Sequence, residues 1–152
     1  MTDLQDLFAL AAEHAAYIFK EKGEVVAMWH TVDANDQHTV IVTPWKDSDE
    51  KRELVQALRT MFKAIGVTRY VFMCEAWALV TGDMAEVNRY IGRVGEHPDR
   101  REILTVRAED KDGNQMAGWY YILRPEHAPA TLSPLHMSEA DHTEGALTGM
   151  LK

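Results

Sequence analysis

The chain has a single cysteine, Cys74, among its 152 residues. An internal disulfide is therefore excluded, and such scarcity is typical of proteins from a reducing cytosol. Because Cys74 lies in an apolar stretch, a buried, unreactive thiol is favoured over a nucleophile. No run approaches the roughly 18 apolar residues that a membrane span needs. The first four residues lack the basic region of a signal peptide. We expect a cytoplasmic protein without membrane contact.

Positive charge is also scarce, with 16 lysines and arginines against 24 aspartates and glutamates. The resulting net charge of −8 argues against a nucleic-acid partner, because phosphate neutralisation needs clustered Lys and Arg. The acidity leaves room for a protein partner.

Familiar catalytic and ligand-binding spacings are missing. No serine sits in Gly-x-Ser-x-Gly, and the chain has no His-x-His, no His-Glu-x-x-His and no cysteine pair. Gly92 and Gly95 are too close together for a P-loop, and no Lys-Ser/Thr follows them. We therefore expect no cofactor and no metal.

The most informative segment that is present covers residues 67–80, which is apolar on both alternating faces. A strand with two apolar faces is covered on both sides, by helices, another sheet or a second subunit. One face carries Tyr70, Phe72, Cys74, Ala76, Ala78 and Val80, and the other carries Val71, Met73, Glu75, Trp77 and Leu79.

Apolar periodicity and capping signals predict the remaining elements. The first long helix covers residues 3–22, with Thr2 and Gln5 at capping-box spacing. A second helix follows Asp47, which forms a capping pair with Glu50, and ends at Gly66. Five strands are predicted at 25–32, 38–43, 67–80, 103–109 and 116–123, and a short helix at 83–91. Asp112-Gly113 predicts a hairpin turn between the last two strands. The fold class is therefore α+β, with an antiparallel sheet of about five strands and two main helices packed on one face.

The composition changes after Pro125 toward Pro, His, Ser, Thr and Gly. We expect one α+β domain over residues 1–125 and a tail over 126–152 that is mobile or lies on the surface. The apolar end of this tail, residues 147–151, could dock on the domain.

Glu75 lies in the middle of the two-sided strand, where an unpaired charge would be costly. Together with His97 and Asp99 from the following charged loop, it forms the candidate catalytic set. A buried carboxylate near a histidine and an aspartate could bind a divalent metal or transfer protons.

A structural ion pair is the favoured alternative for Glu75. Its partner would be Arg100, Arg101 or Arg107, since arginine bonds carboxylates in a bidentate manner inside folds. Such a pair would anchor the charged loop to the sheet.

His30 and His38 flank the first hairpin turn and resemble a chelating pair. With a four-residue loop the two side chains point to opposite faces of the sheet. They can share a metal only if the loop has an odd number of residues, so we expect no metal there.

Four aromatic residues are candidate binding residues: Trp29, Trp77, Trp119 and Tyr121. Trp119 and Tyr121 share one face of the last strand, and Trp29 and Trp77 are expected together on one face of the sheet. An exposed aromatic face would be an interface. The alternative is that the tail or the loop covers it. Either case allows a homodimer through the sheet.

The Glu75-Ala76-Trp77 strand, the loop His97-Pro98-Asp99-Arg100-Arg101-Glu102 and the hairpin after it resemble small uncharacterised proteins of bacteria and their phages. The resemblance covers residues 67–123. It implies a bacterial or phage setting and assigns no catalytic residue.

The leading hypothesis is a non-enzymatic, cytosolic protein-interaction module that forms a homodimer and presents an acidic, aromatic-bearing surface to a protein partner. A phage-encoded modulator or inhibitor of a host protein is one form of it. The alternative is a small metal-dependent hydrolase that uses Glu75, His97 and Asp99. A third class, a small-molecule sensor, would need a closed apolar cavity between the second helix and the sheet.

Overall fold

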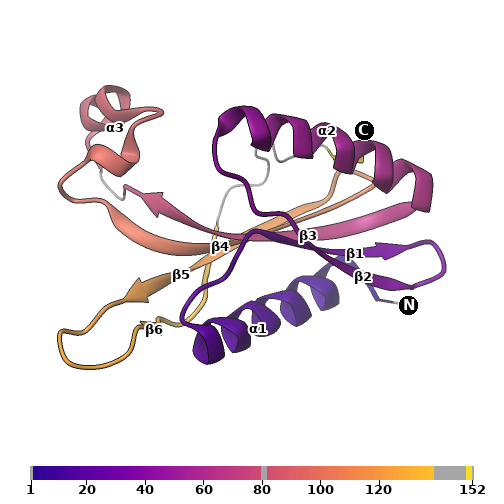
Figure 1. Ribbon diagram of the computed structural model, residues 1–152, viewed down its shortest axis with the longest axis horizontal. Coiled ribbons are helices and arrows are strands. Elements are labelled where there is room, and N and C mark those ends of the chain that lie inside the picture. The colour runs from indigo at the N-terminus through magenta and orange to yellow at the C-terminus, as the bar shows by residue number, and fades with distance from the viewer. Residues whose placement is uncertain (1, 80–81, 139–149, 152) are drawn as a thin grey trace.

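The computed structural model describes residues 2–79, 82–138 and 150–151 (Figure 1). Helices and strands follow one another in the order α1 (Leu4–Lys22), β1 (Met28–Asp33), β2 (His38–Val42), α2 (Ser48–Ile65), β3 (Val67–Ala78), α3 (Met84–Tyr90), a 3-10 turn (Val94–Glu96), β4 (Arg101–Asp110), β5 (Gln115–Leu123), β6 (Thr131–Leu132) and β7 (His136–Met137).

Local signals set the ends of both long helices. Asp47 caps α2 by accepting a hydrogen bond from the Glu50 N–H, as predicted, and Gly66 ends the helix at a φ of 75°. In α1 the cap is Asp3, one residue later than the expected Thr2, and it accepts from the Asp6 N–H. The Thr2 N–H donates instead to the Asp36 carboxylate, which ties the chain start to the β1–β2 loop.

The strands form one antiparallel sheet in the order β2-β1-β3-β4-β5-β6, with β7 also paired to β5. The predicted α+β class is confirmed, and the sheet has seven strands where about five were expected. The two additional strands are two residues long each and follow Pro125, in a segment whose composition carried no strand signal.

The two long helices lie on opposite faces of the sheet (Figure 1). Val71 and Met73 of β3 pack in the cluster under α1, whereas Tyr70 and Phe72 pack in the cluster under α2. The expectation that both helices pack on one face is therefore wrong. Because this half of β3 is apolar on both faces, each face needs its own cover, as its alternating pattern predicted.

The segment after Pro125 contributes to the fold where it is described. β6 and β7 add to the β5 edge, and Met150 is 2% exposed in the cluster under α2. Residues 139–149 lie outside the described part, so the expected tail character of 126–152 stays a prediction. No helix in the described ranges is long and apolar enough to cross a membrane.

Candidate functional site

Trp29 is a core residue and not a binding residue. Its side chain is fully buried under α2, with ring centroids 4.3 Å from Phe72 and 5.7 Å from Phe62, and its indole N–H donates to the Thr43 hydroxyl. The register pairs Trp29 with Phe72, which places it on the α2 face, whereas Trp77 is on the α1 face. The expectation that these two tryptophans share a face is therefore wrong. These rings fill the space under α2 that a sensor cavity would occupy.

Trp119 and Tyr121 lie on the α2 face of β5, opposite Thr105 and Ile103 of β4. Three neighbours, Arg101, Arg107 and His136, lie on the same face. These five residues are called the aromatic–arginine surface. The Arg101 guanidinium lies 3.7 Å from the centroid of the Tyr121 ring, and the His136 ring stacks on Trp119 at 5.6 Å. The aromatic pair predicted from the sequence thus shares a surface with cations.

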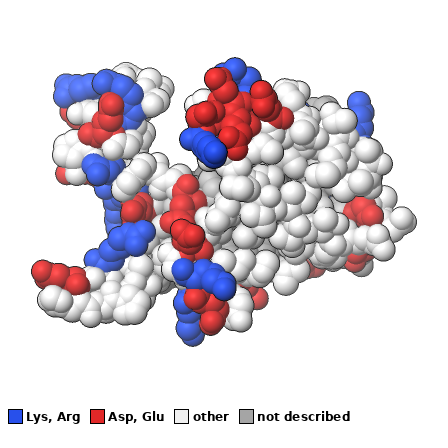
Figure 2. Space-filling view, in the orientation of Figure 1, with Lys and Arg blue, Asp and Glu red and all other residues white. Residues whose placement is uncertain are grey.

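The two arginines of this surface are exposed to solvent. None of the ion pairs within residues 2–79 and 82–138 includes Arg101 or Arg107. In Figure 2 basic side chains lie at the end of the molecule beside α3, with acidic side chains among them. An acidic aromatic surface was expected; the surface is locally basic on a chain whose net charge is −8.

Trp77 lies beyond the end of α1 on the other face of the sheet and is 46% exposed. The Arg100 guanidinium sits 4.7 Å from the centroid of its ring, and a Cβ on Gly95 would lie 3.2 Å from its Cδ1 atom. Trp77 therefore holds the α3 excursion, which is the segment between β3 and β4 that contains α3, against the end of β3. It takes no part in the aromatic–arginine surface.

Glu75 does not form the expected ion pair. Its carboxylate is half-buried and accepts a 2.7 Å hydrogen bond from the Val25 N–H, which fixes the link between α1 and β1. Arg101 and Arg107 lie opposite Ala78 and Phe72, and so on the other face of the sheet. Arg100 is engaged with Trp77 and with the His97 carbonyl oxygen. The strand register and the contacts of Arg100 thus direct the three candidate arginines away from Glu75.

His97 is buried and uses both ring nitrogens inside the α3 excursion. Its Nδ1 accepts from the Asp99 N–H at 2.9 Å, so Nε2 is left to donate to the Glu86 carboxylate at 3.0 Å. Asp99 forms this hydrogen bond with its backbone N–H, and the Asp99 side chain is exposed to solvent. The structure thus brings together two of the three candidate catalytic residues, without Glu75. Glu86, which sequence reasoning missed, is the carboxylate paired with His97.

His30 and His38 lie on the same face of the sheet. The Asp33 N–H donates to the Gln37 carbonyl, so the loop has three residues rather than four, and Asp36 adopts a φ of 61° at its third position. The Nε2 of His30 and the Nδ1 of His38 are 2.8 Å apart. Burial, His38 and His14 lower the pKa of His30 to about 4, so its ring is neutral at neutral pH.

Glu109 is a deeply buried carboxylate that the sequence did not mark. Glu109 is 3% exposed and accepts a 3.0 Å hydrogen bond from the Tyr70 hydroxyl, which is also buried. Burial raises the pKa of Tyr70 further above its usual value, so the hydroxyl remains a donor. Glu109 comes just before the Asp112-Gly113 turn and looks there like part of a solvated charged run, so no sequence signal marked it.

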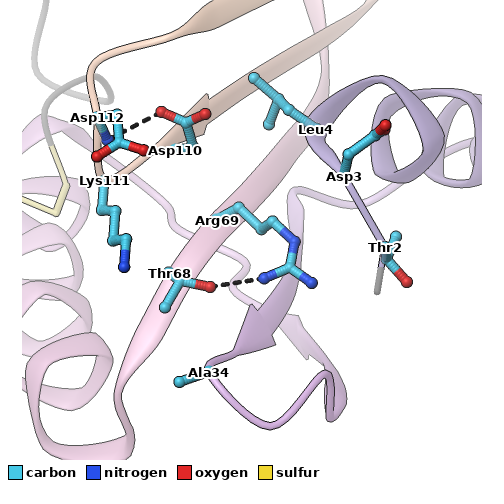
Figure 3. Close-up of a pocket in the computed structure, with 9 residues that line it drawn as sticks. All are labelled: Thr2, Asp3, Leu4, Ala34, Thr68, Arg69, Asp110, Lys111 and Asp112. Carbon is cyan, nitrogen blue, oxygen red and sulfur yellow. Dashed lines mark hydrogen bonds between the residues drawn. The ribbon is translucent and has the colours of Figure 1, made fainter.

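A pocket of about 340 Å³ opens at the far end of the sheet from the aromatic–arginine surface (Figure 3). Its lining residues are Thr2, Asp3, Leu4, Ala34, Thr68, Arg69, Asp110, Lys111 and Asp112. Arg69 is 7% exposed and donates to the Asp36 carboxylate and the Thr68 hydroxyl. The buried guanidinium is thus used to hold the β1–β2 loop against β3.

Within the described ranges, no group of three or more His, Cys, Asp or Glu side chains is arranged to hold a metal ion. Burial raises the pKa of the Cys74 thiol, which also disfavours a nucleophilic role. The chain matches no protein-family model, and no curated protein or solved structure matches it.

Proposed function

We propose that this protein is a non-enzymatic interaction module that binds an acidic segment of a partner protein through the aromatic–arginine surface. The observation that supports this most is the pair of exposed guanidinium groups, Arg101 and Arg107, beside Trp119 and Tyr121 on the sheet. Arginine, tryptophan and tyrosine are the residues most enriched in the energetic centres of protein interfaces.

The geometry favours a carboxylate-bearing ligand. Arginine binds carboxylates with two parallel hydrogen bonds, and Arg101 is already held in place over the Tyr121 ring. A segment with acidic and apolar side chains would satisfy both the cations and the half-buried rings. A nucleic acid offers similar chemistry, but its phosphates would be repelled by a chain with a net charge of −8. The resemblance to small proteins of bacteria and their phages makes a host protein the first partner to search for.

A random-peptide display library, panned against the full chain, tests this proposal. We expect the selected peptides to carry Asp or Glu next to apolar residues. Titration calorimetry should show that Arg101→Glu or Trp119→Ala weakens these peptides at least about tenfold, or 1.4 kcal/mol. The matched control Arg52→Glu, at an exposed arginine on α2, should leave their affinity unchanged.

Two outcomes would overturn the proposal. One is that the selected peptides bind both surface variants as well as the unchanged chain. The other is salt-dependent binding of oligouridylate that the same two variants abolish, which would assign the surface to single-stranded nucleic acid. Circular dichroism of each variant checks that the fold is retained.

A further inference from the structure

β2 is the first strand of the sheet and has β1 as its sheet neighbour. The Thr43 N–H donates to the Ala27 carbonyl at 2.8 Å, and main-chain groups alternate in direction along an antiparallel strand. The N–H and C=O groups of His38, Val40 and Val42 therefore point away from β1. No hydrogen bond within the described part of the chain engages them. This edge presents a row of open donors and acceptors.

Within β2 the edge lacks three devices that usually prevent strands from pairing with other chains, namely charged side chains, proline and a β-bulge. Residues 37–45 contain no Asp, Glu, Lys or Arg, and the β1–β2 register has no bulge. Val40 and Val42 are 45% and 55% exposed. In Figure 2 the right-hand part of the visible face, where α2 lies above and α1 below β1 and β2, is mostly uncharged.

Exposed apolar side chains continue from this edge onto α1. Leu10 and Tyr17 are both well exposed and lie on the same flank of the helix as His14. That flank is turned toward β1, because the opposite flank of α1 meets β5, where the Tyr120 hydroxyl donates to the Ala12 carbonyl. The open strand therefore borders an apolar patch on the α1 face of the sheet.

We propose that two copies of this chain associate through β2, antiparallel across a twofold axis at Val40, so that the two sheets become one. This interface goes beyond the proposed function and is separate from the aromatic–arginine surface. A homodimer through the sheet is expected from the sequence, and this proposal places the contact at the β2 edge.

The register follows from which main-chain groups are open. If Val40 pairs with Val40 of the second copy, His38 pairs with Val42 on both sides, and all three outward-facing residues form hydrogen-bonded pairs. A shift of the axis by one residue in either direction leaves two such pairs. Pro44 has no N–H to donate, so the main-chain pairing between the two copies ends beyond β2. The Val40-centred register is therefore the longest.

A second copy fits this edge better than a charged partner does. Each chain has a net charge of −8, so two copies repel each other, and an uncharged contact such as β2 adds no further repulsion. In the twofold register valine meets valine, and histidine meets valine. A closed dimer also follows, because the opposite edge of the sheet is occupied by β6 and β7, which disfavours head-to-tail growth.

Light scattering of the full chain measures the mass. We expect a dimer for the unchanged protein and a monomer for Val40→Lys, because the two introduced ammonium groups would face each other across the twofold axis. Val40→Pro should act likewise, since it removes an outward N–H and leaves the β1 ladder intact. The matched control Ile91→Lys, at a 73% exposed apolar residue beside α3, should stay a dimer.

Cysteine cross-linking tests the register. The two Val40 Cα atoms would be about 5.5 Å apart, which is within disulfide range. In a Cys74→Ala background, mild oxidation should give a covalent dimer with Val40→Cys. The same treatment should give none with Val42→Cys, which would face His38.

A monomeric unchanged protein would overturn the proposal, and so would a Val40→Lys variant that remains a dimer. Cross-linking of Val42→Cys in preference to Val40→Cys would overturn the register. Peptide binding at the aromatic–arginine surface is measured separately, so failure of the dimer leaves the proposed function untouched, and the reverse also holds.

Discussion

At the β5 edge of the sheet, short strands and a serine hydroxyl take up main-chain hydrogen bonds, whereas the β2 edge keeps three residues open. The Tyr121 N–H donates to the Ser133 hydroxyl, and the Tyr121 carbonyl accepts from the Ser133 N–H. Three of the five prolines also fall in this covering segment, between residues 125 and 134. Prolines and short strands are common protections of a sheet edge.

The difference between the edges shows where this chain can add a neighbour. An edge strand is protected only where further residues cover it, and here the segment after Pro125 covers β5. The β2 edge has a continuous, uncharged strand and no comparable cover in the described part of the chain. Loss of protection at β5, or of support behind β2, should therefore change assembly as well as stability.

The largest effect is expected for Trp29→Ala, which removes the core side chain behind β2. Trp29 joins β1 to α2 and donates to Thr43 at the end of the edge strand. Loss of a buried tryptophan should lower the free energy of unfolding by about 3–5 kcal/mol, measured by urea denaturation. Trp77→Ala, at a half-exposed ring, is the control and should cost less. An unchanged stability would contradict the core role of Trp29.

Gly118→Ala should uncover the protected edge. A Cβ at this position would lie 2.7 Å from the His136 carbonyl oxygen, so β7 would have to move away from β5. We expect a loss of about 1–3 kcal/mol, as for other overpacked sites, and species heavier than a dimer in light scattering. Gly82→Ala is the matched control, because nothing lies within 4 Å of its added Cβ. Equal behaviour of the two variants would argue against β7 as an edge cover.

A smaller loss of stability is expected when Glu75 is replaced, because Glu75 holds the link between α1 and β1. Glu75→Ala removes the acceptor of the Val25 N–H and should cost about 1 kcal/mol, since the site is partly exposed. Glu75→Gln keeps an oxygen acceptor and should change stability little. A large loss for the glutamine variant in thermal melts would instead indicate that the negative charge has an essential partner.

His30 should make the stability of the β1–β2 hairpin pH-dependent, with no effect above pH 6.5. Its pKa falls from 6.5 in the unfolded chain to about 4 in the fold, so the unfolded state binds the proton first. The free energy of unfolding should therefore decline as the pH falls from 6.5 toward 4. The decline should be weaker in His30→Gln when denaturation is followed across this range. A slope that the substitution leaves unaltered would assign it to other groups.

Much of the local structure could be predicted from the sequence, while the candidate site could be predicted only in part. The capping pair of Asp47 and Glu50 was correct because both partners lie within one helical turn. Trp119 and Tyr121 were placed on one face correctly, since a strand alternates with period two. The arginines beside them come from β4, and only the pairing of β4 with β5 brings them there.

What the sequence by itself determined is therefore local: the helix ends, the Asp112-Gly113 turn and the two apolar faces of β3. The tertiary structure decided which helix covers each face, that Glu75 bonds the Val25 N–H, and that His30 and His38 meet. The physical reason is register. One residue more or less in a loop moves every following side chain to the other face, and the interactions that fix it join residues far apart in the chain.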